Sequence, residues 1–78
     1  MTHLTVRTKN SLYNQQGLTS RIEECTKIPF KIKRRGKHCF NVTFDNPINS
    51  KLANKIADNL GLINSYMSSA SCIISDDF

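Results

Sequence analysis

Hydrophobic and polar residues alternate in two regions of the chain, and this alternation predicts β-strands. The first region is 2–9, where Leu4 and Val6 are separated by polar side chains. The second region is 28–44, which we expect to fold as a hairpin that turns at Gly36, because glycine can adopt the positive φ of a tight turn. The hydrophobic residues of this hairpin fall at alternate positions, at Ile28, Phe30 and Ile32 before the turn and at Phe40, Val42 and Phe44 after it.

Hydrophobic residues spaced three and four positions apart predict two helices. The first helix is expected over residues 19–27, with Ser20 in the capping position. The second helix is expected to follow Asn46 as its cap and to begin at Pro47, because proline is favoured at the first helical position. It is expected to end near Asn59, with Gly61 as the left-handed residue of its C-cap. The apolar stripe of this second helix contains Ile48, Leu52, Ala53, Ile56, Leu60 and Ile63.

A last short strand is expected over residues 70–75, so the predicted order of elements is βαββαβ. This order resembles the ferredoxin-like α+β fold, which implies a four-stranded antiparallel sheet with both helices on one face. Residues 1–78 are expected to form a single small domain, because a chain of this length supports one core. The open face of the sheet is predicted to display Thr5, Arg7, Lys31, Lys33, Cys39, Asn41 and Thr43.

Positive charge concentrates in the predicted hairpin. The chain has 11 Lys and Arg residues against 6 Asp and Glu residues, and six of these basic residues lie within 27–37, where there is no acid. Like charges in one turn repel each other unless an anion such as phosphate compensates them. Arg34 and Arg35 at the hairpin tip can bind phosphate or carboxylate in a bidentate manner. We therefore predict a binding or regulatory protein that contacts nucleic acid, or the acidic surface of a nucleoprotein complex, through Arg7, Lys9, Lys31, Lys33, Arg34, Arg35, Lys37 and His38.

Three alternatives stay open from the sequence alone. RNA-recognition domains carry base-stacking aromatic residues on the strand that corresponds to 38–44, but here the Phe side chains alternate toward the core, and His38 is the only ring expected near the exposed surface. Residues 55–70 resemble the helix-turn-helix of phage repressors, which implies a recognition helix after Gly61. The small size and basic surface also resemble, in general character, phage-type inhibitors of host proteins or defence complexes such as anti-CRISPR proteins.

No catalytic, metal or cofactor site is predicted. Cys25, Cys39 and Cys72 lack metal-ligand spacing and are expected to be reduced thiols, and His38 and Cys39 point to opposite faces of a strand. The sequence has no pattern of a signal peptide or membrane span, so the protein is expected in the cytoplasm and not at a membrane. Exposed edge strands in so small a domain can also pair between two copies, which keeps a homodimer open.

Overall fold

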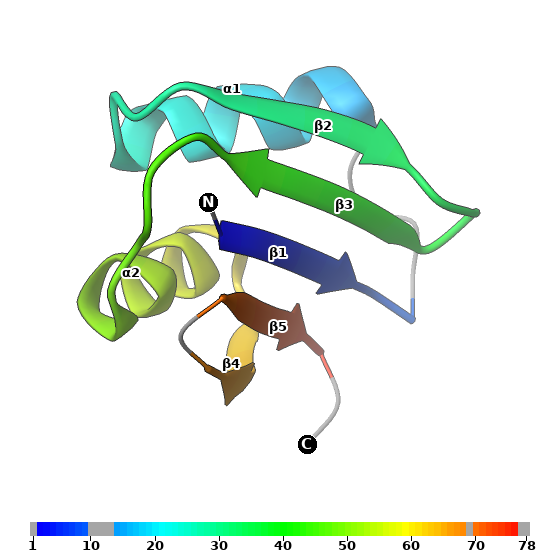
Figure 1. Ribbon diagram of the computed structural model, residues 1–78. Helices are drawn as coiled ribbons and strands as arrows, with labels where there is room; N and C mark the ends of the chain where they lie inside the picture. Colours follow the sequence, from blue (N-terminus) through cyan, green and yellow to red (C-terminus); the bar gives the residue numbers. More distant parts are fainter. Residues whose placement is uncertain (1, 10–13, 69, 77–78) are drawn as a thin grey trace.

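The sheet has five strands, and both helices pack against one of its faces (Figure 1). The structure is a computed structural model that describes residues 2–9, 14–68 and 70–76. The prediction of a small α+β domain is confirmed. The elements are β1 (Thr2–Arg7), α1 (Gln15–Cys25), β2 (Phe30–Arg34), β3 (Cys39–Phe44), α2 (Ser50–Leu60), β4 (Ile63–Met67) and β5 (Ser71–Ser75).

The strand order is β2-β3-β1-β5-β4, and the prediction of a four-stranded antiparallel sheet is wrong. After α2 the chain forms the extra edge strand β4, and β5 then returns to lie between β4 and β1. As a result β5 runs parallel to β1, whereas the other neighbouring strands are antiparallel. The ferredoxin-like pattern accounts for the order from β1 to α2 and fails beyond it.

The recognition helix that the helix-turn-helix alternative requires is absent, because Ile63–Met67 form strand β4. The sequence of this strand, INSYM, does not alternate, and a bulge between Asn64 and Tyr66 interrupts its pairing with β5. A β-bulge inserts one extra residue and breaks the two-residue period from which strands are recognised. The segment was therefore not predicted as a strand.

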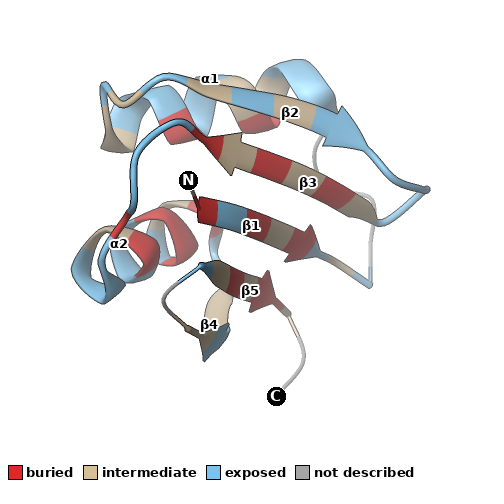
Figure 2. Ribbon diagram, in the orientation of Figure 1, coloured by how far each residue is buried: buried red, intermediate tan, exposed pale blue. Residues whose placement is uncertain are grey.

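The core lies between the helices and the sheet (Figure 2). In β1 and β3 every second residue is buried, as the alternation predicted. Of the predicted stripe, α2 buries Ala53, Ile56 and Leu60 and half-buries Leu52, whereas Ile48 and Ile63 lie outside the helix. The fully buried side chains of largest volume come from the three strands β1, β3 and β5 and from both helices, and burial of each apolar side chain contributes roughly 1.5–3 kcal/mol. They include Leu4, Val6, Leu18, Ile22, Val42, Phe44, Ile56 and Ile74.

Both helices begin at asparagine caps that the sequence did not reveal. The Asn14 side chain accepts a hydrogen bond of 2.7 Å from the backbone N–H of Gly17, so α1 begins before Ser20 and the predicted cap is wrong. The Asn49 side chain accepts one of 2.8 Å from Leu52, so α2 begins after Pro47. The predicted cap Asn46 is therefore wrong as well. Asparagine and serine cap helices about equally well, so the type of residue alone does not separate Asn14 from Ser20 or Asn49 from Asn46.

The two glycines of the predicted turns behave differently. Gly61 has a φ of 72° and ends α2 in the left-handed conformation, as predicted. Gly36 does not have a positive φ, so the predicted turn geometry is wrong. Four residues, 35–38, connect β2 to β3, and a connection of this length does not require a left-handed glycine. Neither helix in the part of the chain that the structure describes is long and apolar enough to cross a membrane.

Candidate functional site

The face of the sheet that the helices leave uncovered carries polar and basic side chains at its β2–β3 side. Lys31 and Lys33 are exposed on β2, where they alternate with residues that pack toward the core. The strand register aligns Lys31 with Thr43 and His3, and it aligns Lys33 with Asn41 and Thr5. Arg7 and Cys39 lie opposite each other at the end of β1, and with the exception of His3 all of these residues belong to the open face that the sequence predicted.

A hollow of about 530 Å³ lies on this face. Arg35 reaches toward β3, and with the Asn41 amide oriented so that its oxygen accepts, the guanidinium donates two hydrogen bonds to it, of 2.7 Å from Nε and 3.2 Å from Nη2. Thr43 Oγ1 and His3 Nδ1 are 3.4 Å apart. The hollow therefore combines three cations with side chains that can donate hydrogen bonds, and its lining is His3, Lys31, Ile32, Lys33, Arg35, Asn41 and Thr43.

A second hollow, of about 360 Å³, lies where β1 ends and β3 begins. An acid is part of this hollow, because the Asp76 carboxylate accepts a 2.7 Å hydrogen bond from the backbone N–H of Lys9. The carboxylate reduces the positive potential here relative to the first hollow. The second hollow is lined by Arg7, Thr8, Lys9, Gly36, Lys37, His38, Cys39 and Asp76.

The two arginines of the hairpin tip are separated. Arg34 is aligned with Phe40, whose side chain is buried on the helix side of the sheet, and its guanidinium carbon lies 5.8 Å from the centre of that ring. Arg34 Nε also donates a 2.9 Å hydrogen bond to the carbonyl of Gly36. Of the eight residues predicted to bind, the structure brings seven to the two hollows and places Arg34 away from both.

The β4–β5 side of the open face has a different character, which the sequence did not predict. Tyr66 of β4 is aligned with Ile73 of β5 and has 52% of its surface exposed. Tyr66 is the exposed large hydrophobic residue among those that the structure describes. His38 is therefore not the only ring at the exposed surface. No periodic signal identified Tyr66, because the bulge next to it disrupts the alternation.

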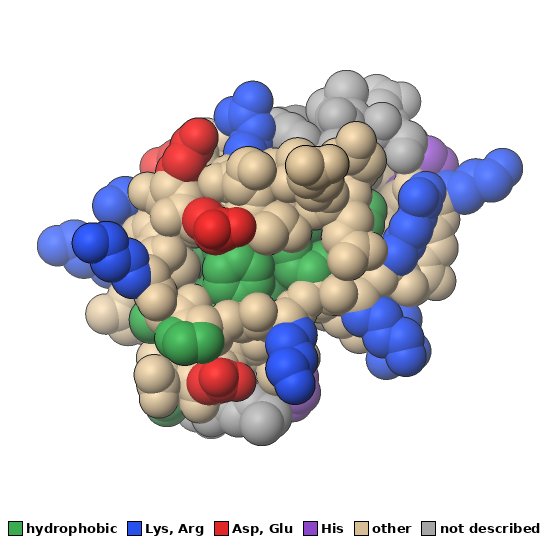
Figure 3. Space-filling view, turned by 90° about the horizontal axis from the view of Figure 1, so that it is seen from above, with side chains coloured by type: hydrophobic (Ala, Val, Ile, Leu, Met, Phe, Trp, Pro, Cys, Tyr) green, Lys and Arg blue, Asp and Glu red, His purple; other side chains and the backbone are tan. Residues whose placement is uncertain are grey.

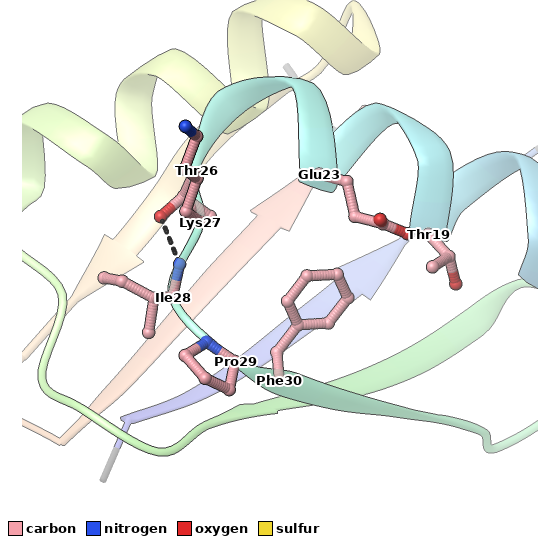
Figure 4. A pocket seen from close by; sticks show the side chains of 7 residues that line it. All are labelled: Thr19, Glu23, Thr26, Lys27, Ile28, Pro29 and Phe30. Atoms are coloured by element: carbon pink, nitrogen blue, oxygen red, sulfur yellow. Dashed lines mark hydrogen bonds between the residues drawn. The ribbon is translucent and has the colours of Figure 1, made fainter.

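A separate hollow of about 390 Å³, lined by both polar and hydrophobic side chains, lies between α1 and the edge strand β2. Figure 3 views this edge and shows hydrophobic surface between the helix and the strand, with Lys and Arg side chains projecting around it. In Figure 4 the Phe30 ring points toward Glu23 and Thr19 of α1, and Thr26 Oγ1 accepts a 3.1 Å hydrogen bond from the backbone N–H of Ile28. None of the residues predicted to bind lines this hollow.

The described residues contain no group of three or more His, Cys, Asp or Glu side chains that could hold a metal ion. The three cysteines are free thiols, and burial raises the pKa of the Cys72 thiol. Comparisons of this chain with protein-family models, with curated proteins and with solved structures found no match.

Proposed function

We propose that the open face of the sheet binds nucleic acid through its β2–β3 side, and that the protein is a binding or regulatory protein without a catalytic step. The observation that carries this proposal is the arrangement of Lys31, Lys33 and Arg35 around one hollow on a single face. A row of cations along a strand suits a chain of phosphates, because each neutralised phosphate releases counterions and adds to the affinity.

The distribution of acids supports the same face. The strand residues that face the open surface include no Asp or Glu among those that the structure describes. Glu23 and Glu24 lie on α1, and Asp58 lies on α2. The lining of the first hollow contains three cations and no acid, whereas Asp76 lies in the second hollow, so a polyanion is attracted most strongly to the first hollow.

Polar side chains in the first hollow can supply the remaining contacts. His3, Asn41 and Thr43 lie between the cations of β2 and the centre of the sheet. Side chains of these types commonly donate hydrogen bonds to phosphate and sugar oxygens, which position a nucleic acid without reading its sequence. We therefore expect modest sequence preference and strong dependence on salt. Arg7, Lys37 and His38 extend the positive surface toward the second hollow.

The test is a comparison of two triple variants that remove the same charge. In the first, Lys31, Lys33 and Arg35 become Gln; in the control, Lys27, Lys51 and Lys55 become Gln. The control residues lie on or next to the helices, away from both hollows of the open face. Binding of labelled single-stranded and duplex oligonucleotides is measured by fluorescence anisotropy from low to near-physiological salt. Thermal unfolding is measured for each variant to establish that it is folded.

At 0.1 M salt the first variant is expected to bind a single strand about 100-fold more weakly and a duplex several hundred-fold more weakly, since the loss of three phosphate contacts reduces the slope of log affinity against log salt by about 2 for a single strand and about 2.7 for a duplex. The control is expected to keep most of its affinity and its slope. Equal losses in both variants would mean that net charge alone attracts the nucleic acid. Absence of binding by the native protein even at low salt would overturn the proposal and direct attention to an acidic protein as the partner.

A further inference from the structure

The side chain of Tyr66 is held on the open face by its neighbours in β4. Asn64 is on the helix side, where its Nδ2 donates a 3.0 Å hydrogen bond to Asn54 of α2. Met67 also packs against the core. The bulge leaves Tyr66 aligned with Ile73, on the face opposite to Asn64 and Met67. Ser65, the extra residue, is anchored to the same face because its Oγ is 2.5 Å from Ser75 Oγ.

Tyr66 is in line with the basic residues at the other edge of the sheet. The register connects Lys33 of β2 to Asn41, Thr5, Ile73 and finally Tyr66. Four strand spacings separate the ends of this row, which is about 19 Å. The side chains between the ends are of moderate length, and Ile73 is half-buried beside the ring. One row across the open face thus has a cation at one edge and an exposed aromatic ring at the other.

The basic edge and the exposed ring together favour single-stranded over duplex nucleic acid. In a duplex the faces of the bases are stacked on one another, so a ring on a protein surface has access to the phosphates but not to the base faces. In a single strand the bases can turn out of the stack and lie against an aromatic side chain while the phosphates follow a basic groove. An exposed ring on the same sheet face as a basic surface is therefore useful for a single strand that crosses the face and is not needed for a duplex.

We infer that the open face binds single-stranded nucleic acid, with its phosphates along Lys31, Lys33 and Arg35 and one base stacked on Tyr66 against Ile73. This inference rests on the proposed function and adds the substrate class to it. The ring accepts any base, because every base has a π face, so the contact adds affinity without adding sequence recognition.

The experiment measures binding of labelled 12-nucleotide oligo(dT), 12-nucleotide oligo(U) and a 12-base-pair duplex to the full chain and to two variants, Tyr66→Ala and Tyr66→Phe. A stacked base contributes about 1–3 kcal/mol, so Tyr66→Ala is expected to weaken single-strand binding roughly 5- to 150-fold. Tyr66→Phe keeps the ring and is expected to restore most of that affinity. The salt dependence should be the same in all three proteins, because no charge is changed. The two single-stranded oligonucleotides distinguish DNA from RNA as the preferred source of the strand.

Several outcomes would overturn the inference while leaving the proposed function intact. One is unchanged single-strand affinity in Tyr66→Ala, and another is an equal loss of duplex affinity, since a structural effect of the substitution acts on both ligands. A third is a homodimer that Tyr66→Ala dissociates in size-exclusion chromatography with light scattering, which would assign the ring to self-association. If the native protein binds none of the three oligonucleotides at low salt, the proposed function fails together with the inference. A stable single-strand complex that requires the ring and keeps its salt dependence supports it.

Discussion

The two hairpins, β2–β3 and β4–β5, lie at opposite edges of the same sheet and differ in how strictly their side chains alternate. The pairing of β2 with β3 is unbroken from Phe30 to Arg34. The pairing of β4 with β5 is interrupted by the bulge between Asn64 and Tyr66. Because its side chains alternate strictly, the first hairpin could be predicted from its sequence. The second hairpin depends on contacts with α2 and β1 that only the folded chain provides.

The largest effect is expected from a substitution beneath both hairpins. Ile56 of α2 is fully buried in the one core cluster that both hairpins share. A domain of 78 residues has a stability of about 4–12 kcal/mol. Ile56→Asp places a carboxylate in that core at a cost of more than about 4 kcal/mol. We expect the variant to be largely unfolded, as measured by far-UV circular dichroism and urea unfolding.

Lys55→Asp is the matched control for Ile56→Asp, because Lys55 is exposed on the same helix one residue earlier. It introduces the same side chain into solvent, and we expect its stability to stay within about 0.5 kcal/mol of the native protein. A single unfolding transition in the control would show that the two hairpins unfold together. A folded Ile56→Asp protein with native stability would contradict the described core.

The sequence was sufficient for one half of this comparison and insufficient for the other. The alternation around Phe40 and Val42 predicted β3, and the spacing around Ile56 predicted α2, because an element that buries one face has hydrophobic residues at regular intervals in its sequence. The sequence of strand β4 has no such regular pattern of hydrophobic residues. The contacts of this strand include the hydrogen bond between Asn64 and Asn54 of α2 and the packing of Met67 against the core, and these depend on how the rest of the chain is folded.

The candidate site divides in the same way. The basic residues at the first hollow could be predicted, because Lys31 and Lys33 fall at alternate positions of β2 and the positions between them are apolar. The same alternation places consecutive residues on opposite faces of a strand. The prediction that Arg34 and Arg35 bind the same partner group did not take this into account. Tyr66 was missed because its position on the open face follows from the bulge, which shifts the parity of β4 by one residue.

A pair of glycine substitutions sharpens the comparison at the connections of the two hairpins. Gly61, just before β4, has a φ of +72°. A side chain there costs about 1–2 kcal/mol. An added Cβ would meet nothing within 4 Å at Gly61 or at Gly36, the glycine of the β2–β3 connection. The backbone conformation alone should therefore decide how alanine at each position changes the stability. Gly61→Ala should lower the free energy of unfolding by that amount, whereas Gly36→Ala should leave it unchanged or raise it by about 0.4–1 kcal/mol, since alanine restricts the unfolded chain.

Urea unfolding of the two glycine variants checks this contrast directly. The midpoint for Gly61→Ala is expected below that of the native protein, and the midpoint for Gly36→Ala at or above it, with the same slope for both. Gly61 also ends α2 through hydrogen bonds from its own N–H to Asp58 and from the N–H of Leu62 to Ala57. Destabilisation by Gly36→Ala equal to that by Gly61→Ala would mean that the β2–β3 turn has the left-handed conformation that the structure assigns to Gly61 alone.

The smallest expected effect is a difference in the rate at which two cysteines, one from each hairpin, are alkylated in the folded protein. Cys39 is half-buried and lines the second hollow, whereas Cys72 of β5 is fully buried on the helix side. Burial raises the pKa of Cys72, so its thiol stays protonated at a pH where an ordinary thiol begins to ionise, and only the thiolate reacts with an alkylating reagent. Modification of Cys72 also requires a local opening of the core.

We therefore expect iodoacetamide to modify Cys39 at least about tenfold faster than Cys72 under native conditions at mildly alkaline pH, because an opening that costs more than about 1.4 kcal/mol slows the reaction by that factor. Mass spectrometry of peptides after timed alkylation measures the two rates. In urea above the unfolding midpoint the rates should converge, since the difference belongs to the folded state. Fast modification of Cys72 in the native protein would mean that the β4–β5 hairpin opens readily, and that its irregular pairing makes it the less stable edge of the sheet.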